Sequence, residues 1–337
     1  RRSRFHAADS LVVAGLTTQR RLLGPDHPIT ARSLGRLASI RAAAGLFPEA
    51  ETLYREALAA LRAHHGPEHP EVALMMNELA GVRQEQDAFE EAEQLMQDAL
   101  AIRRRRYGDR HAAVIQSMRS LAGLLREQDR YEEARALYDA ALEQTRQVYG
   151  DAHPTVAAAL NDLGGLSADV GAYDAALDYY EQAARLAETA LGQAHMSAIG
   201  YRSSLATVYL YQGRYADARD VLQESIARAV SLVGEQHMAI ADFRNNLSYA
   251  LGYLGDAEAS EHELRKALAI EQALYGERHT EVATTMASLS TLLWDAGRHD
   301  EALTTAEQAL ALRRQLLPPV HTDLGNSLYS LGSMYMT

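Results

Sequence analysis

Residues 66–70 read Gly-Pro-Glu-His-Pro, and residues 150–154 read Gly-Asp-Ala-His-Pro. Related segments recur throughout the chain, with a histidine every 42 residues and a glycine three residues before seven of the eight histidines. Eight anchors in one register indicate an internal repeat of 42 residues. The histidines are His27, His69, His111, His153, His195, His237, His279 and His321.

Each repeat holds two stretches with helical spacing. Within residues 70–107, Val72, Met76 and Leu79 recur three and four positions apart, and a second such stretch follows the polar break at residues 85–87. Glycine at the joint suits the left-handed conformation that ends a helix, and proline suits the first turn of the next one. The pattern therefore predicts a pair of antiparallel helices, A and then B, in every repeat.

Leucine and small residues form further columns with the same period. In the third repeat Leu121 precedes Ala122 in helix A, and Ala134 and Ala141 follow in helix B. Small side chains at fixed sites let helices pack closely. These columns resemble the tetratricopeptide repeat. The 42-residue period with its Gly-x-x-His-Pro joint resembles the longer subclass found in kinesin light chains and many bacterial proteins.

The resemblance implies an all-α fold, a right-handed α-solenoid superhelix of antiparallel helix pairs with about 16 helices. We expect one array over residues 1–337, with seven full repeats over 24–317, a lone helix B over 1–23 and a lone helix A over 318–337. Open repeats at both ends indicate a fragment of a longer chain or ends covered by another copy. The single lysine beside 32 arginines favours a bacterial source.

The composition excludes several classes of protein. The 337 residues include no cysteine, so disulfides, cysteine-based zinc sites and thiol nucleophiles are excluded. A formal net charge of −12 argues against nucleic acid or an anionic membrane as the partner. No apolar run is long enough to cross a membrane, and the one lysine, Lys266, is not part of a Walker loop. We therefore expect a cytoplasmic protein without a cofactor.

No arrangement of polar residues indicates catalysis. Carboxylate pairs such as Glu90-Glu91 lie in the first turn of a helix B, where negative charge suits the helix dipole. The eight periodic histidines are one helix pair apart and cannot converge on a metal, so we predict that they close the joints and cap backbone groups. His64, His65 and His69 offer a metal trio, but a solvated helix end explains them more simply. We predict no metal site and no enzyme activity.

The family resemblance implies a concave groove lined by helices A. Asparagine recurs at one inward position, at Asn77, Asn161 and Asn245, although it is a poor residue for a helix interior. In kinesin light chains the matching asparagines hydrogen-bond the backbone of an extended peptide. We expect the same here, with hydrogen bonding between helices as the alternative.

The two halves of the predicted groove differ. Repeats 2–4 are polar and contain Arg119 and Arg126, whereas repeats 5–7 contain aromatic residues that suit binding anchors or, alternatively, packing between repeats. Arg202 and Arg244 replace apolar residues, so we expect them to pair with a carboxylate or to reach into the groove. The expected carboxylates are Asp242 and Glu224. The predicted groove residues are Asn77, Arg119, Arg126, Asn161, Arg202, Tyr211, Arg244, Asn245, Tyr249, Tyr253 and Trp294.

The sequence thus favours a non-enzymatic scaffold that binds an extended peptide or a partner segment in its groove. Its partners are expected to be proteins or peptides rather than nucleic acid or membranes. Two alternatives stay open. One is a regulatory or sensor region of a larger signalling protein, such as a kinase or a signalling ATPase. The other is a head-to-tail array formed through the incomplete terminal repeats.

Overall fold

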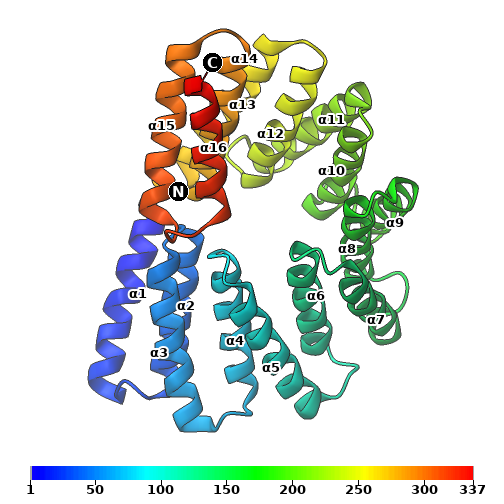
Figure 1. Ribbon diagram of the computed structural model, residues 1–337. Helices are drawn as coiled ribbons and strands as arrows, with labels where there is room; N and C mark the ends of the chain where they lie inside the picture. Colours follow the sequence, from blue (N-terminus) through cyan, green and yellow to red (C-terminus); the bar gives the residue numbers. More distant parts are fainter. Residues whose placement is uncertain (1, 337) are drawn as a thin grey trace. The chain divides into compact units, whose positions relative to one another are not determined.

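The computed structural model describes the backbone of residues 2–336 and the side chains of residues 11–336. Arg1 and Thr337, which belong to the two predicted terminal helices, lie outside the described residues. Within residues 2–336 the structure contains sixteen α-helices and no strand (Figure 1). The all-α solenoid predicted from the repeat is therefore confirmed.

The helices alternate between the two types that the repeat predicts. Helices A pack beside their neighbours of the same type, as α8, α10 and α12 do, and against the helix B that follows, as α4 does against α5 and α12 against α13. The helices A are α2 (Pro28–Ala43), α4 (Pro70–Gln84), α6 (Ala112–Glu127), α8 (Pro154–Asp169), α10 (Met196–Tyr211), α12 (Met238–Tyr253), α14 (Thr280–Asp295) and α16 (Thr322–Met336). The helices B are α1 (Arg2–Leu23), α3 (Phe47–His65), α5 (Phe89–Tyr107), α7 (Tyr131–Tyr149), α9 (Tyr173–Leu191), α11 (Tyr215–Val233), α13 (Ala257–Tyr275) and α15 (His299–Leu316).

The helices form two compact units. The first comprises Arg1–Val148 with Leu316–Pro318, and the second comprises Tyr149–Gln315 with Pro319–Thr337. Each unit has the same alternation of helices A and B, so each is a stretch of the repeat array with its own buried core.

The periodic histidines begin the helices A. At each of the eight joints the histidine Nδ1 accepts a hydrogen bond from the backbone N–H two residues later, over 3.1 to 3.3 Å. This bond satisfies one of the backbone donors that a helix leaves without a partner at its start. The preceding glycine ends the helix B with a positive φ, for example 84° at Gly66 and 82° at Gly150. One short motif therefore ends one helix and starts the next.

Small residues let the paired helices approach closely. Ala80, Ala122 and Ala206 are fully buried in helices A. At one crossing only glycine fits, because a Cβ on Gly164 of α8 would lie 2.7 Å from the ring of Tyr180 on α9. The small columns of the sequence are thus the contact points of the helix pairs.

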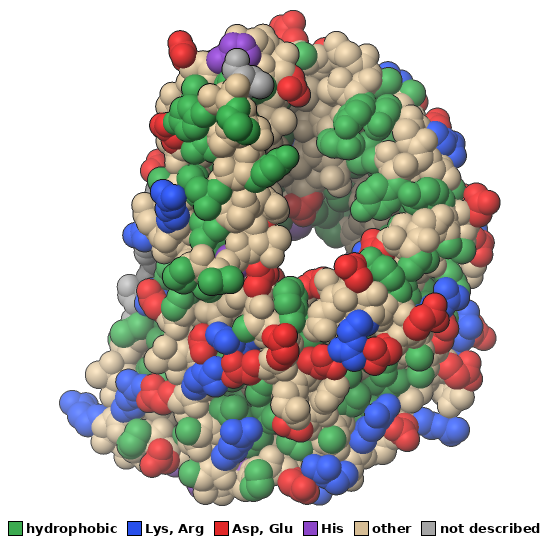
Figure 2. All heavy atoms as spheres, in the orientation of Figure 1, with side chains coloured by type: hydrophobic (Ala, Val, Ile, Leu, Met, Phe, Trp, Pro, Cys, Tyr) green, Lys and Arg blue, Asp and Glu red, His purple; other side chains and the backbone are tan. Residues whose placement is uncertain are grey.

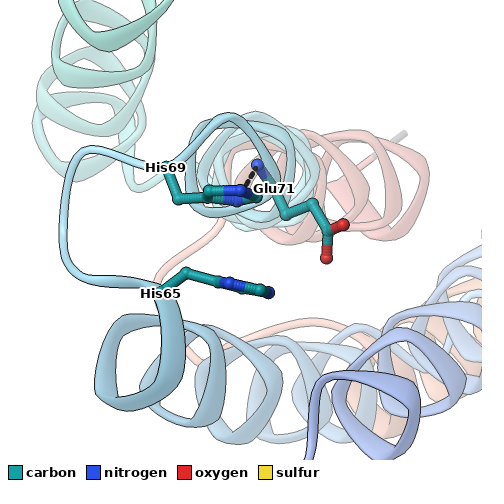
Figure 3. A group of neighbouring side chains, drawn as sticks. All are labelled: His65, His69 and Glu71. Carbon is teal, nitrogen blue, oxygen red and sulfur yellow. Dashed lines mark hydrogen bonds between the residues drawn. The ribbon is translucent and has the colours of Figure 1, made fainter.

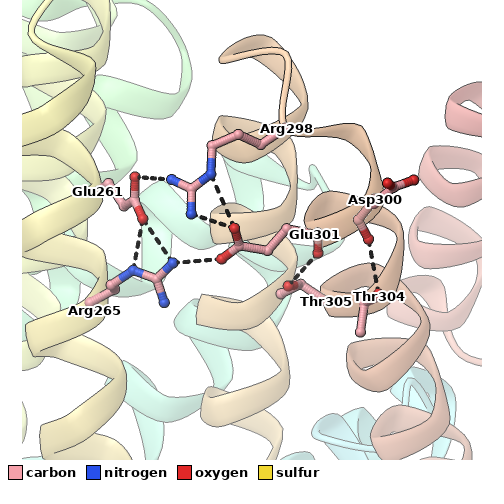
Figure 4. Close-up of polar contacts among 7 residues, drawn as sticks. All are labelled: Glu261, Arg265, Arg298, Asp300, Glu301, Thr304 and Thr305. Atoms are coloured by element: carbon pink, nitrogen blue, oxygen red, sulfur yellow. Dashed lines mark hydrogen bonds and ion pairs between the residues drawn. The ribbon is translucent and has the colours of Figure 1, made fainter.

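Ion pairs connect successive helices B. In the second unit Arg298 donates to Glu261 of α13 at 2.6 Å and also contacts Glu301 of α15, and Arg265 of α13 donates to Glu301 at 2.8 Å (Figure 4). These side chains are partly exposed, so solvent screening leaves each pair only a small contribution to stability. The network orders one face of the array but does not hold the core together.

Candidate functional site

Asn77 of α4 lies in a buried polar cluster. The guanidinium of Arg103, at the end of α5, is 7% exposed and donates to Ser117 Oγ of α6 at 2.7 Å and to the carbonyl of Ala113 at 3.1 Å. Since a guanidinium only donates, the amide oxygen of Asn77 faces it and accepts from Arg103 at 2.8 Å. We call Asn77, Arg103 and Ser117 the arginine site.

The arginine site borders a pocket of about 190 Å³ between α4, α5 and α6. Burial lowers the pKa of Arg103, and none of the described carboxylates lies within ion-pair distance of its guanidinium. Gly81 and Ser120 keep the pocket open because their side chains are small. The lining residues are Leu74, Asn77, Glu78, Gly81, Arg103, Gln116 and Ser120.

Asn245 of α12 occupies the same repeat position four repeats later, in the second unit. Its Nδ2 donates to Glu271 Oε1 of α13 at 3.2 Å and to Thr285 Oγ1 of α14 at 3.1 Å. Glu271 is 2% exposed, and burial raises its pKa to about 7. We call Asn245, Glu271 and Thr285 the glutamate site. Both asparagines therefore hydrogen-bond between helices, as the alternative interpretation proposed.

Asn161 of α8 differs from the other two asparagines. Its Oδ1 accepts from Ser204 Oγ of α10 at 3.1 Å, and its Nδ2 forms no hydrogen bond with another described residue. The reason lies in the repeat, since Ala187 stands where Arg103 and Glu271 stand in the other two sites. Asn161 thus lacks a charged partner on the helix B, and its amide nitrogen is available to a ligand.

Tyrosine rings cluster on the helix-A face of the second unit. Tyr211 of α10 is 56% exposed, and Tyr249 and Tyr253 of α12 are 51% and 60% exposed. Tyr215, the first residue of α11, stacks on Tyr253 with ring centres 4.5 Å apart and planes inclined by 13°. Figure 2 shows hydrophobic side chains gathered over α10 to α12. We call Tyr211, Tyr215, Tyr249 and Tyr253 the tyrosine patch.

Three rings of the tyrosine patch, those of Tyr215, Tyr249 and Tyr253, contact one another. The hydroxyl of Tyr249 donates to that of Tyr253 at 3.3 Å, and the ring centres lie 4.8 Å apart. This hydrogen bond, together with burial, raises the pKa of Tyr249 to about 12. Tyr249 and Tyr253 are consequently exposed and yet ordered before any ligand arrives.

Trp294 of α14 is not part of this patch. Its ring is half-buried, lies 4.3 Å from the His299 ring, and packs against the cluster formed by Leu264, Leu289 and Leu293. The geometry favours packing between repeats over an open binding anchor.

The four arginines predicted for the groove all have contacts within the protein. Arg202 of α10 donates to Glu188 of α9 at 2.8 Å, and Arg244 of α12 pairs with Glu263 of α13. Arg119 and Arg126 of α6 are half-buried and also contact other residues of the chain.

The expected pairing of Arg202 and Arg244 with Asp242 or Glu224 is wrong. Glu224 pairs instead with Arg228, one turn along the same helix. The carboxyl of Asp242 has a pKa raised to about 6 by burial and by the charge of Glu281. The actual partners lie on the helices B against which α10 and α12 pack.

The buried partners of the asparagines were not predicted from the sequence. They occupy a column whose other members, apart from Arg313, are apolar or small, and a comparison of its members would have revealed them. From the second to the eighth joint that column reads Leu61, Arg103, Thr145, Ala187, Ala229, Glu271 and Arg313.

The family of the chain is identified by comparison with known sequences. A family profile described as a tetratricopeptide repeat matches residues 1–63, 71–138, 116–189, 197–270 and 240–315. The chain belongs to the tetratricopeptide-repeat family. No curated protein matches it in sequence. Among the residues described, no helix combines the length and the apolar character that a membrane span requires.

Solved structures of low sequence identity share the fold of this tetratricopeptide-repeat chain. A Rap protein complexed with competence and sporulation factor is 18% identical, with a TM-score of 0.59, over 88% of this chain and 82% of that one. BtubC (BKLC) from P. vanneervenii is 20% identical, with a TM-score of 0.50, over 81% and 92%. The Cut9-Hcn1 hetero-tetramer of APC/C is 13% identical, with a TM-score of 0.53, over 97% and 52%.

Proposed function

We propose that this chain is a non-enzymatic scaffold that binds an extended segment of a partner protein on its helices A. The observation that carries the proposal is the tyrosine patch, in which Tyr211, Tyr249 and Tyr253 are more than half exposed. Tyr253 is held by the stacked ring of Tyr215 and by its contact with Tyr249. Large amphipathic rings that need no further ordering are efficient binding anchors. Family membership supports a role in protein interactions.

The partner segment is expected to combine apolar and basic side chains. Apolar groups and guanidinium groups both pack favourably on tyrosine rings. The net charge of −12 favours a basic partner over an acidic one. The Nδ2 of Asn161, two helices A before the α12 rings, would donate to a backbone carbonyl of the segment.

The asparagine clamp is thereby reduced to one residue. Asn77 and Asn245 use their amides within the arginine and glutamate sites, so they are not proposed to contact a ligand. Two of the three predicted clamp residues are instead assigned to the contact between repeats.

The proposal is tested by comparing partners captured from the source lysate by the wild type and by two variants. Tyr211→Ala with Tyr253→Ala removes two exposed rings, and Leu232→Ala removes an exposed apolar side chain from α11 as a control. We expect partners that are lost only from the tyrosine variant. Identical partners on all three baits would place binding elsewhere.

Self-association is a second candidate because α16 exposes large side chains. Tyr329 and Met336 are 80% and 84% exposed, and Leu328 lies beside Tyr329 with half of its surface exposed. We propose that a second copy covers this face. Light scattering over a range of concentrations should show association that Leu328→Asp with Tyr329→Asp abolishes. A wild-type monomer at every concentration would rule it out.

A further inference from the structure

Two histidines and a glutamate meet where α3 ends and α4 begins. His65 is the last residue of α3, His69 caps α4, and Glu71 lies in the first turn of α4. The two imidazoles are stacked, with centres 4.1 Å apart and planes inclined by 14°. In Figure 3 both rings point the same way, and the carboxylate of Glu71 lies on the side toward which they point.

His65 replaces a tyrosine that does the same packing at other joints. Tyr107, Tyr149 and Tyr275 stack on their joint histidines with ring centres 4.2, 4.6 and 4.1 Å apart. The stack therefore does not require an imidazole. His65 instead brings a buried Nε2 that has no hydrogen-bond partner among the described residues, and an unpaired buried polar atom is unfavourable.

The donor atoms are close enough to share one ion. One ligand atom from each of His65, His69 and Glu71 lies within 4.8 Å of the other two. Tetrahedral zinc, with bonds of about 2.0–2.1 Å, places its ligand atoms about 3.3 Å apart. The remaining difference of about 1.5 Å is within reach of rotations about the soft χ2 torsion of histidine. We infer that His65, His69 and Glu71 bind a divalent transition-metal ion of the zinc type, with water as the fourth ligand.

The chemistry of the donor set agrees with this choice of ion. Imidazole suits zinc, nickel and copper, whereas an oxygen-rich set would suit calcium or magnesium. In proteins zinc is bound by histidine nitrogens and by glutamate oxygens, which are the donors present here.

Two existing interactions oppose the ion. Arg32 of α2 holds Glu71 with two hydrogen bonds, Nε to Oε2 at 3.0 Å and the terminal nitrogen to Oε1 at 2.9 Å. In addition, a metal on Nε2 of His69 leaves the ring proton on Nδ1, which then cannot accept from the backbone N–H of Glu71. Metal binding is thus expected to loosen the contact between α2 and α4 and to replace the histidine cap.

A matched joint in the same chain supplies the control. Tyr275, His279 and Glu281 repeat the arrangement five repeats later, with tyrosine in place of His65. His65→Tyr copies that joint and should fold. The equivalent of Arg32 there is Asp242, whose charge interacts with Glu281, so Tyr275→His would build a second set of ligands without an opposing arginine.

The experiment is a calorimetric titration of the metal-free chain with Zn²⁺ alone, for the wild type and three variants. We expect one ion per wild-type chain, at least tenfold weaker binding in His65→Tyr, and severalfold tighter binding in Arg32→Gln. Tyr275→His should add a second ion. A Co²⁺ titration followed by visible absorption reports imidazole ligation in the same samples.

Two results would overturn the inference. One is a wild-type chain that takes up no Zn²⁺ at micromolar concentrations. The other is equal Zn²⁺ affinity in the wild type and in His65→Tyr, because the ion would then be held by other surface groups. Circular dichroism of each variant checks that the fold is retained, so that a loss of binding reports the site.

Discussion

The arginine site and the glutamate site have the same geometry and opposite charges. Each joins an asparagine of one helix A to a hydroxyl of the next helix A and to a charged residue near the end of the helix B between them. In the first unit the charge is the guanidinium of Arg103, and in the second it is the carboxyl of Glu271. Asparagine suits both because its amide offers an acceptor to the first and a donor to the second.

A recurring asparagine on the helix-A face therefore does not by itself indicate a ligand. The same residue is a neutral connector that adapts to whichever charge the neighbouring helix B supplies. Asn161 has an alanine at that neighbouring position, so its amide has no charged partner on the helix B. The residue on the neighbouring helix B, rather than the asparagine itself, decides whether the asparagine connects two helices or is available to a ligand.

The largest effect is expected when the charge of the arginine site is reversed. Arg103→Glu places a buried carboxylate beside Glu78 and removes the donor to Ser117. We expect a loss of roughly 3 kcal/mol in the free energy of unfolding, since an unpaired buried charge is costly. Urea denaturation measures it. A loss below about 1 kcal/mol would show that the site tolerates either charge.

The glutamate site should make stability depend on pH. Burial raises the pKa of Glu271 to about 7, so the folded chain binds this proton more tightly than the unfolded chain does. The stabilisation is therefore complete at acidic pH and is lost as the pH rises between about 5 and 7, by roughly 2 kcal/mol. Thermal unfolding at several pH values should show this decrease in stability with rising pH. Glu271→Gln should remove the part of the decrease that Glu271 causes. An unchanged slope would mean that Glu271 is ionised throughout.

Removing the connectors should have a smaller effect. Asn77→Ala and Asn245→Ala each leave a buried charged group with one partner fewer, and we expect each to lower the free energy of unfolding by about 1–2 kcal/mol. Chemical denaturation of both variants tests whether the asparagine amide stabilises the buried arginine and the buried glutamate equally. If either variant is as stable as the wild type, its asparagine is not a connector.

The smallest effect on stability is expected at Asn161. Asn161→Ala loses one bond from Ser204 and should change the free energy of unfolding by less than about 0.5 kcal/mol. Under the proposed function the same variant weakens partner capture, which the connector variants leave intact. A large loss of stability, or unchanged capture, would remove Asn161 from the binding surface.

Much of the architecture could be predicted because its signals are local and repeated. The glycine, histidine and proline of each joint specify the end of one helix and the start of the next, so α4 and α8 begin at Pro70 and Pro154, one residue after their histidines. The small columns likewise predicted where the helices cross, as at Gly164.

The polar contacts were harder to predict because they join residues of different columns. Arg202 meets Glu188, fourteen residues earlier on the preceding helix B, whereas the expected partners were chosen from other positions. Trp294 looked like an open anchor, but its neighbour His299 and the leucine cluster beneath cover part of its ring. These contacts depend on the direction in which each side chain points, and the 42-residue period of the sequence does not specify that direction.

The histidine caps determine where each ring carries its hydrogen. Because Nδ1 accepts from the backbone at all eight joints, each neutral ring must hold its proton on Nε2, so one tautomer is selected eight times along the chain. A ring with its hydrogen on Nδ1 has no acceptor there, so the opposite tautomer would lose the same hydrogen bond at the start of each helix A. Nitrogen-15 chemical shifts of the imidazoles would record both states at once.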